Sequence, residues 1–103
     1  MAEPDDTSIL KAKLNQETAR AGWRELQPFF ARGQTVAVAG DLDLIEVAVA
    51  FAEDRVEQIR QWRSQGRVDA VGDDQARGWF EADQEMWTLV VKPWVLVQPA
   101  RAH

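Results

Sequence analysis

Three acidic residues stand close together in the middle of the chain, just before an apolar segment. Asp41, Asp43 and Glu46 are spaced as D-x-D-x-x-E. Carboxylate oxygens are the ligands that magnesium and calcium prefer, so the cluster is a candidate site for a divalent cation. The alternative is structural, since Asp43 and Glu46 have the spacing of a helix-capping box and Asp41 would end the preceding turn. Because the rest of a calcium-binding loop is missing, the sequence favours capping.

The chain has one local concentration of positive charge, formed by Arg55, Arg60, Arg63 and Arg67. Such a patch could bind phosphate or an acidic partner. Arg60 and Arg63 also border an apolar helix stripe that begins at Val56, and arginine stems commonly cover apolar surface while the charged head stays in water. We expect this second arrangement, because the chain as a whole is acidic.

The residues of most familiar catalytic centres are missing. The 103-residue chain has no cysteine, and its single histidine is the last residue, His103. Thiolate nucleophiles, cysteine zinc sites and histidine-based triads are therefore excluded. A net charge of −5 argues against binding to nucleic acid, and the glycines form no phosphate-binding loop. We expect no catalytic residues and no cofactor.

Helix and strand signals alternate along the chain. Apolar periodicity and capping residues predict helices over residues 6–21, 23–33, 44–52, 54–65 and 73–85. Strands are expected over residues 35–38, 67–71 and 86–98. The last segment is either one strand with a bulge or two short strands that meet at Pro93. Because strand–helix–strand units do not repeat regularly, we predict an α+β fold with about five helices packed on a small three- to four-stranded sheet.

Length and composition fit a single domain. An apolar content of 46% is ordinary for a globular protein. We expect residues 6–98 to form the domain, with disordered ends at 1–5 and 99–103. The N-terminus lacks the features of a secretory signal, and the longest apolar run, 47–52, is too short to cross a membrane. We therefore expect a cytoplasmic protein that does not contact membranes.

The five tryptophans fall into two groups. Trp23, Trp62 and Trp79 lie on apolar helix stripes and are expected in the core. Trp87 and Trp94 belong to the last strand segment, where unbroken alternation would place them on opposite faces and a bulge would bring them together. Tryptophan often anchors protein interfaces, so an exposed one would mark a contact surface.

Two segments are apolar on more than one side. The helix at 44–52 has no polar face, and the strand segment at 86–98 is apolar on both sides. The chain's other helices and its sheet could cover these surfaces and leave a monomer. The sequence favours a symmetric homodimer instead. The candidate interface residues are Ile45, Val49, Trp87, Trp94 and Val95.

Four segments of the chain share a pattern with other proteins. They are Asp41-Leu42-Asp43-Leu44, the Val47-Ala48 helix, Gln75-Ala76 with Trp79, and Pro93-Trp94-Val95-Leu96-Val97-Gln98, the most specific of them. Together they resemble a small bacterial family known as domain of unknown function 2288, over about residues 8–98. The resemblance implies a bacterial, cytoplasmic, single-domain protein. It implies no activity, cofactor, partner or functional residue.

Two functions follow from these observations. The absence of catalytic chemistry favours a non-catalytic protein-interaction or regulatory module. The alternative is a small-molecule or divalent-metal-dependent activity that uses Asp41, Asp43 and Glu46. The two are distinguished by whether the three carboxylates converge on one point or point along the end of the helix.

Overall fold

The computed structural model describes residues 6–100 of the chain, and the side chains of residues 7–100. Helices and strands alternate irregularly along this range. In chain order they are α1 (Asp6–Glu17), β1 (Ala19–Gly22), the 3-10 helix η1 (Trp23–Leu26), α2 (Gln27–Ala31), β2 (Thr35–Val38), α3 (Leu44–Ala52), α4 (Val56–Ser64), β3 (Val68–Ala70), α5 (Asp73–Ala82), β4 (Glu85–Val91) and β5 (Trp94–Pro99).

The strands form one mixed sheet in the order β1-β4-β5-β2-β3. The pair β2–β5 is parallel, with Val36 opposite Leu96, and the other three pairs are antiparallel. The strands β1 and β3 are therefore the two edges of the sheet. The predicted α+β class is confirmed, although the described chain contains five strands rather than three or four.

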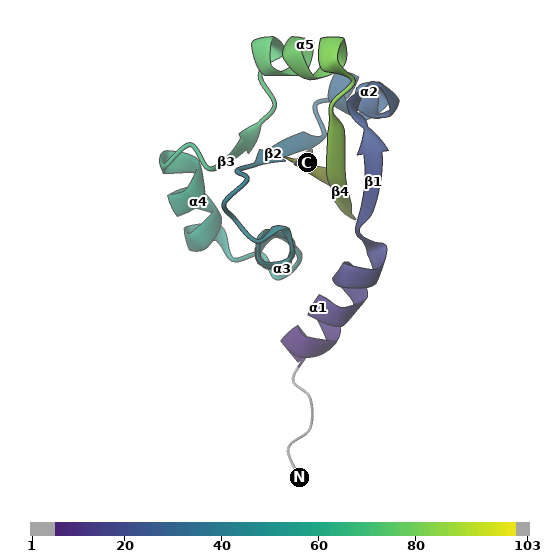
Figure 1. Cartoon of the computed structure of the whole chain (residues 1–103). Helices are drawn as coiled ribbons and strands as arrows, with labels where there is room; N and C mark the ends of the chain where they lie inside the picture. The colour runs from purple at the N-terminus through teal and green to yellow at the C-terminus, as the bar shows by residue number, and fades with distance from the viewer. Residues whose placement is uncertain (1–5, 101–103) are drawn as a thin grey trace.

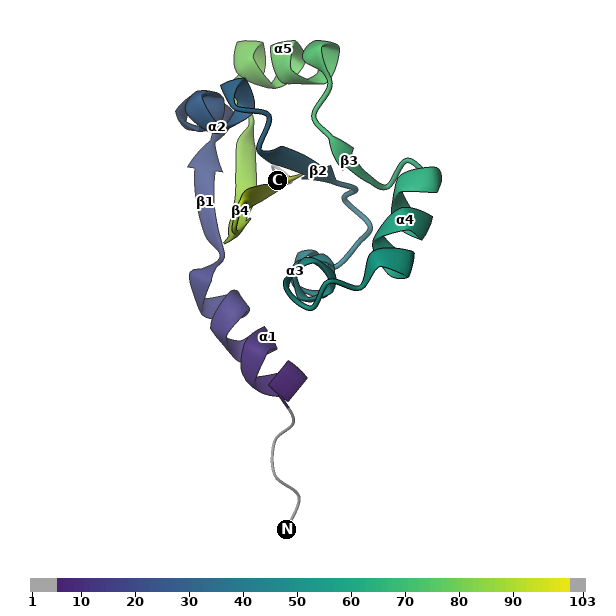
Figure 2. The ribbon, with the colours of Figure 1, turned by 180° about the vertical axis from the view of Figure 1, so that it is seen from behind.

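Helices cover both faces of the sheet (Figure 1). On one face, α1, α3 and α4 enclose a core that includes Leu14, Val47, Trp62 and Leu96. On the other face, η1, α2 and α5 enclose a second core around Trp23, Met86 and Val97. The view from behind shows the same two groups of helices, with α2 and α5 together at the top of the picture and α1 and α3 together at the bottom (Figure 2).

The apolar helix α3 is covered by the chain's own elements. Val47, Ala48, Val49 and Ala50 are fully buried. The sheet lies on one side of α3, and α1 and α4 contact its other sides. The absence of a polar face therefore reflects burial within one chain, and this helix needs no second subunit.

The segment 86–98 is a hairpin, which confirms the predicted alternative of two short strands that meet at Pro93 and excludes one long bulged strand. The chain reverses at Lys92-Pro93, whose peptide bond is cis, and Val91 lies opposite Trp94. Two residues are enough, because two-residue loops are the commonest hairpin connections. Pro93 occupies the turn, so no ladder hydrogen bond is lost. The reversal, rather than a bulge, places Trp87 and Trp94 on the same face of the sheet, at opposite ends of the hairpin.

The predicted first helix is too long. It ends at Glu17, and Ala19–Gly22 forms the edge strand β1, which pairs with β4. Alanine and arginine favour helix locally, but pairing with β4 places Ala21 against the second core and stacks Arg20 over Trp87, 4.3 Å from the ring centroid. Thr18 helps to end the helix, since its hydroxyl donates a hydrogen bond to the Leu14 carbonyl.

Three further boundaries refine the predictions. The predicted helix over 23–33 is divided in two, because Pro28 lies in the first turn of α2, a helix that restarts after η1. Asp54 does not cap α4, because it has a φ of 55° and the residue before the helix is Arg55. The domain continues beyond residue 98, since Pro99 ends β5 and the Ala100 N–H donates to the Glu85 carbonyl. Residues 1–5 and 101–103, where disordered ends are predicted, lie outside the described residues.

Three of the tryptophans lie on helices that pack against the cores. Trp23 is fully buried, and its ring lies edge-on to Phe30 and Trp79, with centroids 5.5 and 5.0 Å away. Trp62 and Trp79 are partly buried against the first and second cores. The indole N–H of Trp23 has no hydrogen-bond partner among the described residues, so aromatic packing holds this side chain.

Candidate functional site

The acidic cluster does not form a common site. The Asp43 carboxylate caps α3 by accepting the Ile45 N–H at 2.9 Å. Asp41 pairs with Arg67, and Glu46 pairs with Lys11 on α1. Each carboxylate is thus directed to a different partner. No group of three or more metal-ligating side chains occurs among the described residues. The predicted capping by Asp43 is confirmed, but Glu46 joins two helices instead of completing the capping box.

The loop before α3 is held by the hairpin. The Gln98 side-chain amide donates to the carbonyls of Ala39 and Leu42, at 2.8 Å each. This places Asp43 at the start of α3. In the first turn of α3, the Glu46 carboxylate lies 2.6 Å from the Lys11 ammonium. The hydrogen bond and the negative charge of Glu46 both raise the pKa of Lys11 above its ordinary value of 10.5. These acidic residues therefore serve the fold.

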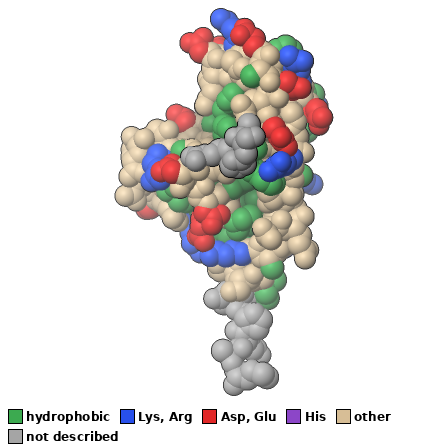
Figure 3. All heavy atoms as spheres, viewed as in Figure 1, with side chains coloured by type: hydrophobic (Ala, Val, Ile, Leu, Met, Phe, Trp, Pro, Cys, Tyr) green, Lys and Arg blue, Asp and Glu red, His purple; other side chains and the backbone are tan. Residues whose placement is uncertain are grey.

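Every arginine of the predicted basic patch has a carboxylate within ion-pair distance, although Arg63 makes no hydrogen bond to its carboxylate. The pairs are Arg55–Glu53, Arg60–Glu57, Arg63–Asp69 and Arg67–Asp41. On the face shown in Figure 3, acidic and basic side chains lie next to one another rather than in separate areas. Such a surface lacks the continuous positive field that attracts nucleic acid. The described arginines do not form a phosphate-binding patch.

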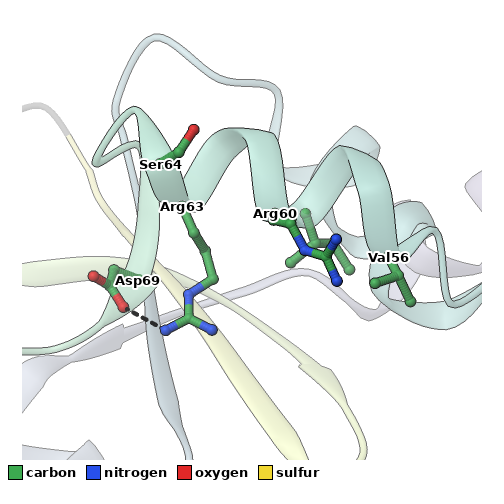
Figure 4. A pocket seen from close by; sticks show the side chains of 6 residues that line it. Val56, Arg60, Arg63, Ser64 and Asp69 are labelled. Carbon is green, nitrogen blue, oxygen red and sulfur yellow. Dashed lines mark ion pairs between the residues drawn. The ribbon is translucent and has the colours of Figure 1, made fainter.

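A cleft of about 490 Å³ runs along α4 beside the edge strand β3. Figure 4 shows Val56, Arg60 and Arg63 on the open side of the helix, with Asp69 of β3 facing Arg63. We call this the α4 cleft. Val56 is 49% exposed although it belongs to the apolar stripe of the helix. Apolar contacts and charged groups are thus both available to a partner here.

An apolar groove of about 300 Å³ adjoins the α4 cleft. It lies between the end of α3, α4 and the β2–β3 edge, and we call it the Trp94 groove. Both cavities are lined by Ile59, Arg63 and Asp69. The apolar side chains that line the groove include Val36, Phe51, Ile59, Val68 and Trp94. Trp94 lines this groove, and 39% of its surface is exposed. Tryptophan is common at protein interfaces, and here it lies beside a groove that is also apolar.

The structure separates the five predicted interface residues. Val49 is fully buried and Val95 is 3% exposed, so neither side chain has surface left for a partner, and both are withdrawn as interface candidates. Ile45 and Trp87 are half-buried and line a different, shallow depression near the start of α3. Trp94 is the predicted residue that reaches the groove. Ile45 and Trp87 do not lie beside it.

Several residues of the groove escaped the sequence analysis. Phe51, Ile59 and Asp69 lie on three separate elements, α3, α4 and β3. Their meeting depends on how α3, α4 and β3 pack, which periodicity does not specify. Val56 lies on the same apolar stripe as Ile59 and Trp62, so the sequence carries no signal that separates this exposed residue from the other two.

None of the helices in residues 6–100 is long and apolar enough to span a membrane. Residues 9–99 match the model of a family described as a protein of unknown function, DUF2288. The resemblance seen in the sequence is thereby confirmed. The solution NMR structure of PA1075 from Pseudomonas aeruginosa is 45% identical in sequence, with a TM-score of 0.78 over 100% of this chain and 99% of that one. No protein of curated function shows significant similarity to the chain.

Proposed function

The chain belongs to the DUF2288 family of proteins of unknown function, and we propose that it is a non-catalytic protein-interaction or regulatory module that acts as a homodimer. We place it in the bacterial cytoplasm, and its similarity to a protein of Pseudomonas aeruginosa supports the bacterial source. Its binding surface is the Trp94 groove together with the α4 cleft.

The observation that carries this proposal is the position of Trp94. Most large apolar side chains of the described chain are buried in the two cores, whereas Trp94 is 39% exposed beside an apolar groove. Val56, which is 49% exposed, lines the adjoining cleft. Exposed apolar side chains scattered singly are ordinary on protein surfaces, but a tryptophan next to an apolar hollow is typical of an interface anchor.

A second copy of the chain is the occupant that fits this surface. In a twofold symmetric dimer the same patch serves both subunits, so it must contain a projection and a matching hollow. Here Trp94 supplies the projection and the groove beside it supplies the hollow. Charged groups of both signs, Arg63 and Asp69, stand at the shared rim, which makes the patch self-complementary in charge as well.

The proposal is tested by replacing Trp94 with alanine. We expect Trp94→Ala to weaken self-association at least about tenfold, because an anchoring tryptophan contributes about 2 kcal/mol or more. The measurement is the molar mass by light scattering over a range of concentrations. Phe80→Ala is the matched control, since Phe80 is also a partly exposed aromatic residue, 45% exposed, on α5.

Circular dichroism and thermal unfolding of each variant check that the fold is intact. If Trp94→Ala and Phe80→Ala change the association equally, Trp94 is not the anchor. If the wild-type chain keeps the mass of one chain at every concentration, the homodimer itself is refuted.

A further inference from the structure

One ion pair on the proposed surface, between Arg63 and Asp69, includes no hydrogen bond. The nearest atoms of Arg63 and Asp69 are 3.6 Å apart, too far for a hydrogen bond, and their side chains are 65% and 58% exposed. In contrast, Arg67 reaches Asp41 at 2.5 Å and Arg20 reaches Glu85 at 3.3 Å. Within residues 7–100, the Arg63 guanidinium therefore keeps its five N–H donors available.

The Asp69 carboxylate accepts a hydrogen bond through only one of its two oxygen atoms among the described residues. Its Oδ1 atom accepts the N–H of Ala70 on the edge strand at 2.8 Å, while its Oδ2 atom has no partner among the described residues. The Arg63 and Asp69 side chains both line the α4 cleft and the Trp94 groove. A guanidinium and a carboxylate oxygen that make no hydrogen bond to the described residues thus stand together at the rim of the surface that we assign to the dimer (Figure 4).

We propose that Arg63 of each chain pairs across the twofold axis with Asp69 of the second copy. This inference rests on the proposed homodimer and specifies the geometry of its interface. A twofold axis repeats every contact, so one exchange of partners forms two such ion pairs. Because charge-assisted bonds between guanidinium and carboxylate can be bidentate, the exchanged pair can satisfy more donors than the pair within one chain. The pair would thereby set the register in which Trp94 meets the groove.

The test is a charge exchange between two variants. Arg63→Glu places two carboxylates on the rim of every chain, and Asp69→Arg places two guanidinium groups there. In a dimer of either variant, like charges face each other twice, so we expect its dissociation constant to rise at least about tenfold. In an equal mixture, each chain meets a partner of opposite charge, and we expect a mixed dimer to form with an affinity close to that of wild type.

Native mass spectrometry, with one variant isotopically labelled, counts the mixed and unmixed dimers. The predicted result is a predominance of mixed dimers at a concentration where each variant alone is monomeric. If each variant alone dimerises like wild type, or if the mixture stays monomeric while wild type dimerises, the Arg63–Asp69 exchange is refuted. Neither of these outcomes refutes the homodimer, which depends on the wild-type mass and on Trp94.

A second measurement covers the case in which a variant fails to fold. Ion pairs at an exposed rim are screened by salt, so the dissociation constant of the wild-type dimer should rise as salt is added. The neutral variant Arg63→Gln should show a clearly smaller dependence on salt. Equal salt dependence of the two proteins would refute the exchange.

Discussion

At the scale of single residues, the acidic cluster has three neighbouring carboxylates with three separate partners. Asp43 binds the backbone of its own helix, Glu46 binds Lys11 of α1, and Asp41 binds Arg67 beside β3. The three partners lie in α3, in α1 and in the bend before β3, so the three carboxylates face different directions. The sequence predicted the helix cap from the residue type, but the partners of Asp41 and Glu46 depend on tertiary packing.

The helix cap at Asp43 makes a direct prediction about stability. Asp43→Ala removes the acceptor of the Ile45 N–H and should lower the free energy of unfolding by about 1 kcal/mol. Asp43→Asn keeps a side-chain oxygen and should remain close to wild type. Urea unfolding of the three proteins measures the difference. Equal losses in both variants would show that the negative charge of Asp43, rather than its capping hydrogen bond, matters.

Divalent cations should not stabilise the chain through the acidic cluster. A ligand raises the melting temperature only if it binds the folded state, and Asp41, Asp43 and Glu46 already have separate partners. We therefore expect millimolar magnesium or calcium to leave the melting temperature of wild type unchanged. A saturable increase that disappears in Asp41→Asn would contradict this account and revive the metal-dependent alternative.

At the scale of elements, most helices and strands could be predicted from local patterns. The bounds 44–52 for the apolar helix agree with α3, and the strand at 35–38 agrees with β2. The strand β1 could not be predicted, because its residues have no strand pattern of their own and owe their conformation to pairing with β4. The sequence could not decide between one bulged strand and two strands over 86–98, because Pro93 interrupts the strand pattern in both arrangements.

The end of α5 provides a prediction at this scale. Asp83 follows the helix in the left-handed region, with φ 46°, and its N–H donates to the Phe80 carbonyl. A left-handed conformation costs a residue with a side chain about 1–2 kcal/mol, while glycine loses about 0.5–1 kcal/mol more backbone entropy on folding. Asp83→Gly should therefore raise the free energy of unfolding by about 0.5–1 kcal/mol.

The matched control is Glu81→Gly in the same helix. Glu81 has ordinary helical geometry, so glycine there should be destabilising by about 0.5–1 kcal/mol. Thermal and urea unfolding of both variants decide the sign. A loss of stability in Asp83→Gly similar to that in Glu81→Gly would show that the aspartate conformation carries no strain.

At the scale of the whole molecule, the proposed function depends on the surface that packing leaves uncovered rather than on the two cores. The sequence analysis attributed the apolar helix and the last strand segment to a subunit interface, yet the two cores of a single chain bury the centre of α3 and most apolar side chains of the strand segment. Val49 and Val95 belong to those cores. Trp94 lies at the hairpin turn, where the helices do not cover it fully, so the structure leaves one of the five predicted residues beside an open apolar groove.

The groove could not be predicted from periodicity because it is formed by parts of separate elements. Phe51 comes from the end of α3, Ile59 from α4 and Trp94 from the start of β5. A local pattern identifies each of these residues as apolar, but it does not show which apolar residues remain uncovered after packing. That distinction decides whether the molecule binds a second copy.

The most direct test of this account is the molar mass of the wild-type chain measured by light scattering during roughly a hundredfold dilution. We predict a mass near twice the 11.7 kDa of one chain at high concentration, falling towards the mass of one chain on dilution. A mass that stays at one chain throughout would contradict the proposed homodimer and the function assigned to the Trp94 groove.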